Sequence, residues 1–381
     1  RRKMRYRRFG PLDWRVSALG FGIMRLPHED GDPSKILEEQ AAAMVRHAID
    51  SGVNYLDTAY NYHEGESEVF LGKVLENGYR DRILLATKLP CWLVEGSEDF
   101  DRYFDRQLEK LRTDHVDFYL LHGLQDDWWE RLRGYGYLDW VERQMADGRI
   151  GHPAFSFHDR LPVFRKIVDD YRGWTMAMVM YNYMDVDYQA GMDGVRYAAD
   201  RGLAVVVMEP LRGGLLGKEP PDQVKQVFRE SGIDRSPAEW ALQWLWDQPE
   251  VSCVISGMSS MDQLVENLGS AGRSGVGSMK GEEKELLIRV RNEYHARKPV
   301  DCTGCRYCMP CPQGVAIPRV LGIYNLGRMY EDPETARMHY SFLGEDHRPP
   351  KCNECGTCME KCPQHLDIIG LLRIAHEHLA Q

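Results

Sequence analysis

The chain has 381 residues, of which 43% are hydrophobic and 28% charged, which is typical of a globular protein with room for a full-sized domain and a smaller one. Its formal net charge of −10 argues against a nucleic-acid partner, because such a partner requires a basic face. No apolar run of about eighteen residues occurs, so no membrane span is expected.

The N-terminus is strongly basic, with six Lys or Arg among the first eight residues. An apolar stretch would follow a twin-arginine export signal, and none follows here, so we expect a solvated terminal strand. Segments 4–9 and 15–17 flank a Gly10-Pro11 turn, a pattern that predicts a small hairpin.

Beyond this hairpin, short β-rich runs alternate with longer amphipathic ones. Strands are expected at 19–22, 55–58, 83–87, 118–121, 154–157, 177–181, 204–208 and 251–255. Helices are expected at 37–51, 66–76, 102–111, 128–147, 161–171, 191–200 and 237–247. Strict alternation indicates parallel strands joined by right-handed crossovers. Eight repeats over about 250 residues favour an α/β fold of the closed (β/α)8 TIM-barrel type.

The C-terminal part of the chain has a different character. Residues 270–281, rich in Gly and Ser, are expected to form the loop that leaves the last barrel helix. A charged helical run follows at 282–297, and further helices are expected at 317–340 and 368–379. We therefore predict a barrel domain over residues 1–281 and a small α-helical domain over residues 282–381.

Eight cysteines of this second domain form two closely spaced blocks. The second block has the spacing that holds cubane clusters in bacterial ferredoxins, and the first is one residue tighter before its last cysteine. In two-cluster ferredoxins the fourth ligand of each cluster comes from the other block. The pattern therefore predicts that residues 282–381 form a ferredoxin-like iron–sulfur domain with two [4Fe–4S] clusters for electron transfer. Cluster I would use Cys302, Cys305, Cys308 and Cys362, and cluster II would use Cys352, Cys355, Cys358 and Cys311.

Two other uses of these cysteines remain open at this point. Zinc sites need only four ligands each and usually appear as separated pairs, a pattern that two triplets followed by Cys-Pro fit poorly. A disulfide framework belongs to short secreted chains, and no export signal is visible. Only Cys91 and Cys253 lie outside the blocks, which fits a reducing, cytoplasmic location.

Polar residues follow the predicted strands at their carboxyl ends, where barrel active sites lie. Asp57 follows the second strand, Lys88 the third and His122 the fourth, and Tyr62 comes five residues after Asp57. The segments DTAYNYHEGESE, LATKLP, FYLLHG and EPLRGGLL closely resemble the aldo-keto reductases. The resemblance covers roughly residues 4–270, and the cysteine-rich tail resembles an iron–sulfur branch of that family.

The four polar residues have complementary chemistry for reducing a ketone or aldehyde with a hydride. The developing alkoxide needs a proton and electrostatic support, which Tyr62 and His122 would provide. The Lys88 ammonium would lower the pKa of Tyr62, and Asp57 would hold Lys88 charged and aimed. Alternatively, Asp57 caps a helix and His122 forms structural hydrogen bonds within a loop. The occurrence of all four residues in the expected order favours the catalytic interpretation.

The resemblance also implies nucleotide-binding residues, although this sequence departs from the family pattern. The family usually places Asn where Phe157 stands, and an amide and an aromatic where Met178 and Met208 stand. Its NADPH enzymes carry cations where Gly257 and Gln263 stand, and their loss weakens binding of a 2′-phosphate. We therefore expect NADH to bind at least as well as NADPH. The residues implied for the nucleotide are Ser156, Leu211, Gly213, Gly214, Ser256, Gly257, Gln263, Glu266 and Asn267.

Three functional hypotheses are compatible with these patterns. The first is an oxidoreductase that reduces a small-molecule carbonyl, with NAD(P)H as hydride donor, Tyr62 as proton donor and Trp92 as a wall of an apolar substrate pocket. Nicotinamide moves two electrons whereas a cubane moves one, so in the second hypothesis ferredoxin or another electron carrier feeds the clusters. Single electrons would then reach a substrate in the barrel. The third makes the cluster domain a structural or docking module on a conventional reductase.

Overall fold

The structure, a computed structural model, describes residues 3–381, so Arg1 and Arg2 of the basic N-terminal run lie outside it. The described chain folds as two compact units. The first contains the residues up to Lys218 together with Arg235–Lys280, and the second contains Glu219–Asp234 and Gly281–Gln381. The sequence predicts one boundary, near residue 281, whereas the structure also assigns Glu219–Asp234 to the second unit.

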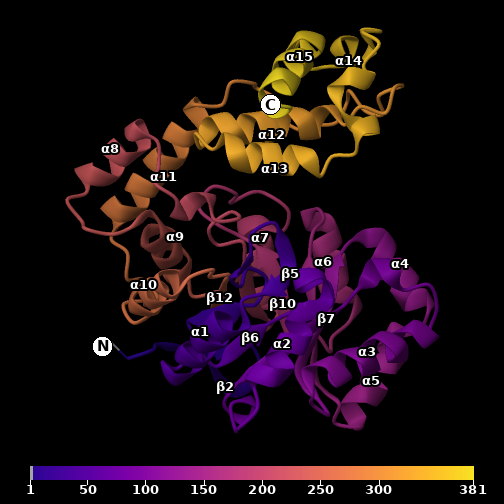
Figure 1. Ribbon diagram of the computed structural model, residues 1–381, viewed down its shortest axis with the longest axis vertical. Helices are drawn as coiled ribbons and strands as arrows, with labels where there is room; N and C mark the ends of the chain where they lie inside the picture. The colour runs from indigo at the N-terminus through magenta and orange to yellow at the C-terminus, as the bar shows by residue number, and fades with distance from the viewer. Residues whose placement is uncertain (1–2) are drawn as a thin grey trace. The chain divides into compact units, whose positions relative to one another are not determined.

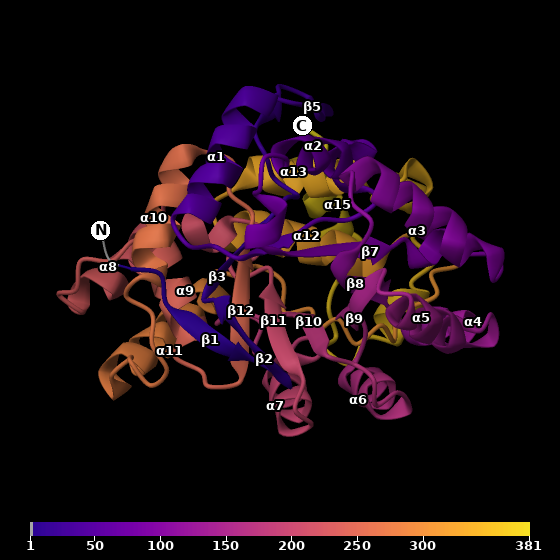
Figure 2. The same ribbon diagram turned by 90° about the horizontal axis from the view of Figure 1, so that it is seen from below.

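Within residues 3–381, eight parallel strands close into a barrel, in the order β10-β11-β12-β3-β6-β7-β8-β9 (Figure 2). The pair β9 and β10 closes the ring, with Ala154 opposite Met176. The predicted (β/α)8 fold is therefore confirmed, and each predicted strand overlaps one barrel strand. The strands are β3 (Leu19–Gly22), β6 (Tyr55–Asp57), β7 (Leu84–Leu89), β8 (Val116–Leu124), β9 (Ile150–Phe157), β10 (Met176–Met180), β11 (Ala204–Met208) and β12 (Val251–Ser256).

Helices surround the barrel because each crossover must bury an apolar face against the strands (Figure 1). They are α1 (Glu38–Asp50), α2 (Glu66–Val74), α3 (Glu98–Leu111), α4 (Asp126–Gly134), α5 (Tyr137–Ala146), α6 (Leu161–Asp170), α7 (Gly191–Asp200), α9 (Pro237–Trp246) and α10 (Met261–Ala271). The single helix predicted over 128–147 is wrong. The chain breaks between α4 and α5 at Gly136, whose φ of 83° lies in the left-handed region that glycine adopts without strain.

Two hairpins flank the barrel. Strands β1 (Tyr6–Phe9) and β2 (Leu12–Ser17) pair antiparallel, which confirms the predicted N-terminal hairpin. The ring of Phe9 packs 5.2 Å from that of Phe118 and 6.1 Å from that of Tyr55, measured between centroids. The hairpin thus fills the barrel near the amino ends of its strands and leaves the carboxyl ends open. Strands β4 (His28–Glu29) and β5 (Asp32–Ile36) form a second antiparallel pair.

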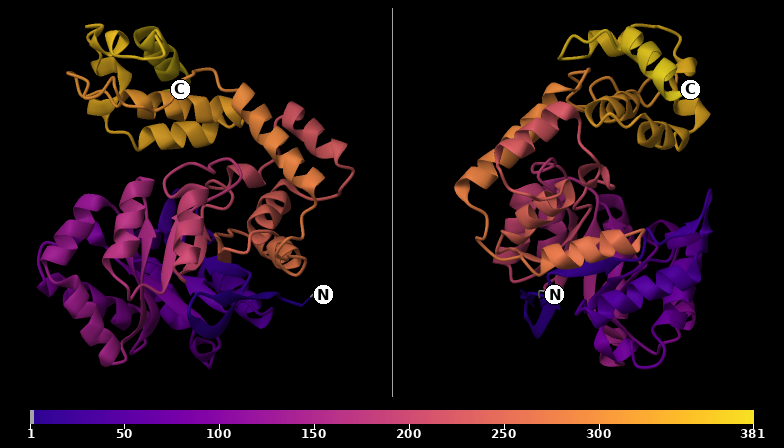
Figure 3. Two further views of the ribbon diagram at one scale, coloured as in Figure 1. Left: turned by 180° about the vertical axis from the view of Figure 1, so that it is seen from behind. Right: turned by 60° about the vertical axis from the view of Figure 1, so that its left-hand side comes forward.

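The second unit is helical. Its helices are α8 (Asp222–Glu230), α11 (Gly281–Ala296), α12 (Ile317–Met329), α13 (Pro333–Ser341), α14 (Thr357–Glu360) and α15 (Ile368–Leu379). Helix α8 packs beside α11, as the rose and orange ribbons of Figure 3 show. The predicted helix over 317–340 is divided into α12 and α13, because Pro333 has no N–H for a continuing helix and instead begins α13. In residues 3–381, no helix has both the length and the apolar character needed to cross a membrane.

Candidate active site

The carboxyl ends of three neighbouring barrel strands bring three of the four predicted catalytic side chains together. Asp57 is the last residue of β6, Lys88 lies near the end of β7, and His122 lies near the end of β8. Because β6, β7 and β8 are adjacent in the barrel, their carboxyl ends share one edge. Tyr62 joins them from the turn that follows β6.

Lys88 is the centre of this group. Its side chain is only 1% exposed, so its ammonium must find all of its partners within the protein. Nζ donates to Asp57 Oδ1 at 2.6 Å, to the carbonyl oxygen of Thr58 at 2.7 Å and to the Tyr62 hydroxyl at 3.1 Å. These three bonds satisfy the three N–H donors of a lysine, and they fix the distance between the ammonium and the phenol.

The charges of the group oppose the effect of burial. Burial acts to lower the pKa of Lys88, but the neighbouring Asp57 and Tyr62 outweigh it, so that the pKa is raised and the ammonium stays charged. Burial raises the pKa of Tyr62, and Lys88 opposes that rise. The effect of Lys88 on Tyr62 thus has the predicted sign, but burial outweighs it, and the pKa of Tyr62 in the free protein is raised.

The turn that carries Tyr62 has an unusual backbone. His63 and Glu64 both have positive φ, at 52° and 55°, a conformation that costs a non-glycine residue about 1–2 kcal/mol. His63 secures the turn, because its Nε2 accepts from the backbone N–H of Leu26 at 3.1 Å and its Nδ1 bonds the carbonyl of Pro33 at 2.7 Å. Both ring nitrogens are thus engaged, which explains His63 as a structural residue.

A buried polar network holds the backbone of Lys88 from behind. Gln107 donates to the carbonyl of Lys88 at 2.9 Å and to Glu68 at 2.6 Å. Its own Oε1 accepts from the Tyr119 hydroxyl at 2.8 Å. Thr87 also donates to Glu68, at 2.6 Å. Buried polar groups need such partners, and here they fix the register of β7 where Lys88 projects.

His122 stands between Tyr62 and an aromatic wall. Its ring centroid is 5.8 Å from that of Tyr62 and 5.2 Å from that of Trp92, in edge-on arrangements. Trp128 continues the wall, 6.3 Å from Trp92. Burial lowers the pKa of His122 well below its ordinary value, with the Lys88 charge adding to the effect, so the imidazole is neutral at pH 7. The buried Nδ1 of His122 has no hydrogen-bond partner among residues 3–381.

A cleft opens beside Tyr62 at this edge of the barrel, and it contains five of the nine residues implied for the nucleotide. They are Leu211, Gly213, Gly214, Ser256 and Gly257. Gly213 and Gly214 have φ of 67° and 96°, so their left-handed loop turns main chain toward the cleft. The buried Oδ2 of Asp57, which also lines the cleft, has no hydrogen-bond partner among residues 3–381. A polar ligand therefore fits this cleft.

The other four implied residues do not line the cleft. The buried Ser156 accepts a hydrogen bond at its Oγ from the backbone N–H of Gly123 at 2.8 Å. Asn267 is also buried and donates to Ser256 Oγ at 3.1 Å. Gln263 accepts from the backbone N–H of Ser259, and Glu266 accepts from the hydroxyl of Ser236. Each of these side chains thus has a partner within the protein.

The cleft also contains two charged residues, Arg25 and Glu209, that are not among the residues implied for the nucleotide, although Glu209 opens the EPLRGGLL segment. Arg25 lies three residues beyond the end of β3, and Glu209 comes directly after β11; their side chains approach within 4.0 Å. The methylenes of Arg25 lie over Gly257, where a Cβ would come within 3.2 Å of them. Both residues stand just beyond the carboxyl end of a strand, the position that identifies Asp57, so the same criterion could have found them.

Two small cavities in the second unit are each lined by four cysteines, three from one block and one from the other. Apolar side chains complete both linings, with Ile317 shared between them. The two sets are the ones that the cysteine spacing predicts. One cavity has Cys302, Cys305, Cys308 and Cys362, and the other has Cys311, Cys352, Cys355 and Cys358.

The arrangement of these thiols favours cubane clusters over zinc or disulfides. All ten cysteines are free of disulfide bonds. Within the described residues 3–381, no group of three or more His, Cys, Asp or Glu side chains is arranged to hold a single metal ion. A zinc would draw four sulfurs to about 2.3 Å from one point, whereas a cubane binds each thiolate at a separate corner iron. Four thiols around a common cavity therefore fit a cubane.

Comparisons with known proteins agree with this geometry. A family model described as the aldo/keto reductase family matches residues 18–273, and a model described as a 4Fe-4S dicluster domain matches residues 301–367. The uncharacterized oxidoreductase YqkF of Bacillus subtilis (strain 168) is 28% identical over 302 residues, which cover 70% of this chain and 91% of that protein. L-galactose dehydrogenase of Arabidopsis thaliana is 27% identical, with 70% and 88% covered.

A solved structure of an aldo-keto reductase also aligns with this chain. The aldo-keto reductase AKR11C1 from Bacillus halodurans, in its holo form, aligns with a TM-score of 0.62 and 26% identity. The alignment covers 75% of this chain and 96% of that one. The likeness therefore accounts for nearly the whole of the relative.

The coupling between Lys88 and Tyr62 predicts a spectroscopic change. In Lys88→Met the ammonium no longer opposes the effect of burial, so the pKa of Tyr62 should rise further. Subtracting the tyrosinate absorbance titration of the matching Tyr62→Phe protein isolates this one phenol. Lys73→Met is the control, because Lys73 pairs with Glu38 on the surface and its loss should leave Tyr62 unchanged. A Tyr62 titration that stays in place or moves to lower pH in Lys88→Met would contradict the coupling.

Proposed function

Because the chain belongs to the aldo/keto reductase family, we propose that it reduces a carbonyl-type small molecule at the edge of the barrel, with a nicotinamide nucleotide as hydride donor and Tyr62 as proton donor. The observation that carries this proposal is the buried Lys88 ammonium, 2.6 Å from Asp57 and 3.1 Å from the Tyr62 hydroxyl. When bound, the nucleotide supplies the hydride. The residues of the chain then have to supply a proton and to stabilise negative charge.

Tyr62 is suited to supply the proton, because a phenol is protonated at neutral pH and burial raises the pKa of Tyr62 further. As the carbonyl oxygen gains negative charge, the Tyr62 proton moves to it, and Lys88 stabilises the phenolate that is left. The neutral His122 keeps one ring N–H to donate to the same oxygen. Trp92 and Trp128 would form the apolar side of the substrate site and exclude water from it.

The nucleotide would be held in the cleft beside Tyr62. The glycine loop at Gly213 and Gly214 brings main-chain N–H groups toward a diphosphate, a common mode of anion binding. Arg25 would contribute the positive charge, since it lies against Gly257 beside that loop. Arg25 would exchange Glu209, which lies within 4.0 Å, for the diphosphate, and Glu209 would then be free to accept hydrogen bonds from the ribose hydroxyls.

The 4Fe-4S dicluster domain would hold two clusters, which supply transfer of single electrons. We propose that each Cys-lined cavity holds one cluster. Cys302, Cys305, Cys308 and Cys362 would bind cluster I, and Cys352, Cys355, Cys358 and Cys311 would bind cluster II.

A second function is favoured by the side chains around the nicotinamide position. Ser156 is engaged by Gly123, and the thioether-bearing Met178 and Met208 face the cleft in place of polar or aromatic groups. If nicotinamide is not the donor, ferredoxin or another one-electron carrier would feed the clusters, and Tyr62 would still supply the proton. In a third variant the clusters only stabilise or dock the second unit. Cys305→Ser separates these functions, because it abolishes carbonyl reduction only if electrons pass through cluster I.

Replacing Tyr62 with Phe should lower turnover by roughly a hundredfold or more, the usual range for a lost general acid. The change keeps the ring and removes only the hydroxyl. Cluster content and nucleotide affinity should stay as in the unchanged protein, measured by iron analysis and by titration calorimetry. Tyr60→Phe is the matched control, because Tyr60 packs against Tyr103 outside the cleft. Near-full activity in Tyr62→Phe would show that the site is misassigned.

Anaerobically purified protein should contain about eight irons and eight sulfides per chain, as two cubanes require. Replacing Cys311 with Ser should damage cluster II and replacing Cys362 with Ser should damage cluster I, as followed by electron paramagnetic resonance of the reduced protein. Cys253→Ala, in the barrel core, should leave both signals intact. Stoichiometric zinc, about four irons, or loss of the opposite cluster in the two Ser variants would refute the ligand assignment.

NADH should bind at least as tightly as NADPH, because no cation stands at position 257 or 263 to hold a 2′-phosphate. Arg25→Gln should weaken both nucleotides together, since a diphosphate is common to both. Calorimetric titration of the two nucleotides checks each statement. The preference is disproved if NADPH binds tenfold more tightly, a difference of about 1.4 kcal/mol. Failure of both to bind would favour the carrier-fed function.

A further inference from the structure

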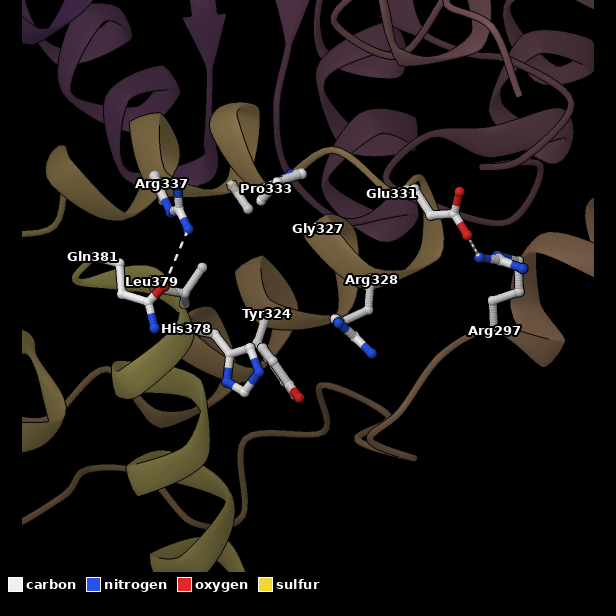
Figure 4. Close-up of a pocket in the computed structure, with 11 residues that line it drawn as sticks. Arg297, Tyr324, Gly327, Arg328, Glu331, Pro333, Arg337, His378, Leu379 and Gln381 are labelled. Atoms are coloured by element: carbon white, nitrogen blue, oxygen red, sulfur yellow. Dashed lines mark hydrogen bonds and ion pairs between the residues drawn. The ribbon is translucent and has the colours of Figure 1, made fainter. Parts of the chain in front are cut away.

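A cavity of about 400 Å³ lies in the second unit. It is next to the last turns of α12 and α15. Its size falls within the range of small-molecule sites, about 300–1,000 Å³. Helices α12, α13 and α15 and the residue that follows α11 contribute its walls, as Figure 4 shows. The residues that carry the argument are Arg297, Tyr324, Arg328, Glu331, Arg337 and His378.

The lining carries an excess of positive charge. Three arginines face one acidic residue, Glu331. Arg297 pairs with Glu331 and also bonds the side chain of Gln223 at 2.7 Å and the carbonyl of Met329 at 3.3 Å. Arg297 and Glu331 therefore neutralise each other and form one rigid wall. The charge that remains for a ligand belongs to Arg328 and Arg337.

Both remaining arginines have hydrogen-bond donors to spare. Arg328, whose side chain is exposed, makes no hydrogen bond or ion pair with any of residues 3–381, and in Figure 4 no dashed line reaches it. Arg337 donates from one terminal nitrogen to Gln381 at 3.4 Å. Its Nε is buried and has no partner among the same residues. A buried donor without a partner destabilises the protein, and an anion is the ligand that satisfies a guanidinium donor best.

The rest of the wall is apolar and aromatic. Leu379 and Ala336 are buried, and Pro333 lies beside them. The ring of Tyr324 lies 5.4 Å from that of His378, with the planes tilted. A bare inorganic ion would leave this surface in contact with water, whereas a ligand with a ring or a short chain would cover it. The cavity therefore matches a molecule that has one anionic end and one apolar end.

The cavity is distinct from the other two kinds of site in the molecule. It shares no lining residue with the cleft beside Tyr62 or with either Cys-lined cavity. Helix α12 connects it to cluster I's cavity, since Ile317 and Leu321 of the same helix line that cavity. A ligand here would thus bind to the cluster-bearing unit itself.

We propose that this cavity binds a small organic anion, a carboxylate or phosphate monoester with an aromatic or aliphatic body, through Arg328 and Arg337. The anionic end would bridge the two guanidinium groups, and the body would lie against Tyr324, His378 and Leu379. This site is independent of the proposed carbonyl reduction, since no catalytic or nucleotide-binding residue contributes to it.

Calorimetric titration of phenyl phosphate into the full-length, cluster-loaded protein at low salt tests the proposal. Phenyl phosphate should bind saturably, and at least tenfold more tightly than inorganic phosphate or benzyl alcohol, each of which offers only one half of the ligand. Arg328→Gln should weaken it at least tenfold, about 1.4 kcal/mol. Because Arg328 is exposed and unpaired among the described residues, this variant should fold normally. Arg319→Gln, an exposed position on the same helix, should bind as the unchanged protein does.

Two variants locate the bound probe. Arg337→Lys keeps the charge but loses the planar donor pair, so it should also weaken phenyl phosphate, while Arg25→Gln in the barrel cleft should not. The proposal is overturned if phenyl phosphate does not bind, or if its affinity is unchanged in Arg328→Gln. It is likewise overturned if Arg25→Gln alone weakens binding, because the probe then occupies the nucleotide cleft.

Discussion

The buried ion pair between Lys88 and Asp57 is the interaction on which the barrel site depends. An ammonium that is almost wholly removed from water is tolerated only with a close counter-ion and full hydrogen bonding, and both are present. Gln107 and Glu68 hold the strand behind it, and the strained turn at His63 holds Tyr62 in front. Removing Lys88 or Asp57 would leave the other charge buried without a counter-ion. Electrostatic attraction therefore holds the two side chains in place as much as packing does.

Burial and charge act in opposite directions on Tyr62. A motif shows that a lysine follows the third strand, but it does not show how deeply the phenol is buried, and burial dominates its pKa in the free protein. A phenol is protonated at neutral pH, and burial favours that form of Tyr62 further. In the proposed reaction Lys88 would stabilise the product of proton transfer from Tyr62 more than the starting state, which is the condition for catalysis.

Much of this could be predicted from the sequence, and the remainder could not, for physical reasons. Alternating strands and helices predict a barrel because that pattern depends on local periodicity. The cysteine spacing predicts the crossed ligand sets because it matches the two-cluster ferredoxin pattern, in which each block supplies the fourth ligand of the other cluster. The break at Gly136 and the separation of α12 from α13 depend on single backbone conformations within otherwise helical patterns. Arg25 over Gly257, the assignment of Glu219–Asp234 to the second unit, and the engaged side chain of Ser156 depend on contacts between residues far apart in the chain, which periodicity does not encode.

The most direct test of the proposed chemistry is the pH dependence of turnover in Asp57→Asn. The amide keeps the size of the side chain and removes the charge that holds Lys88 protonated beside Tyr62. If the ion pair supports proton transfer, turnover at neutral pH falls by roughly a hundredfold or more, with the fold and cluster content unchanged. If Asp57→Asn retains the turnover and pH profile of the unchanged protein, the buried pair is only structural and the proposed role of Tyr62 has lost its physical basis.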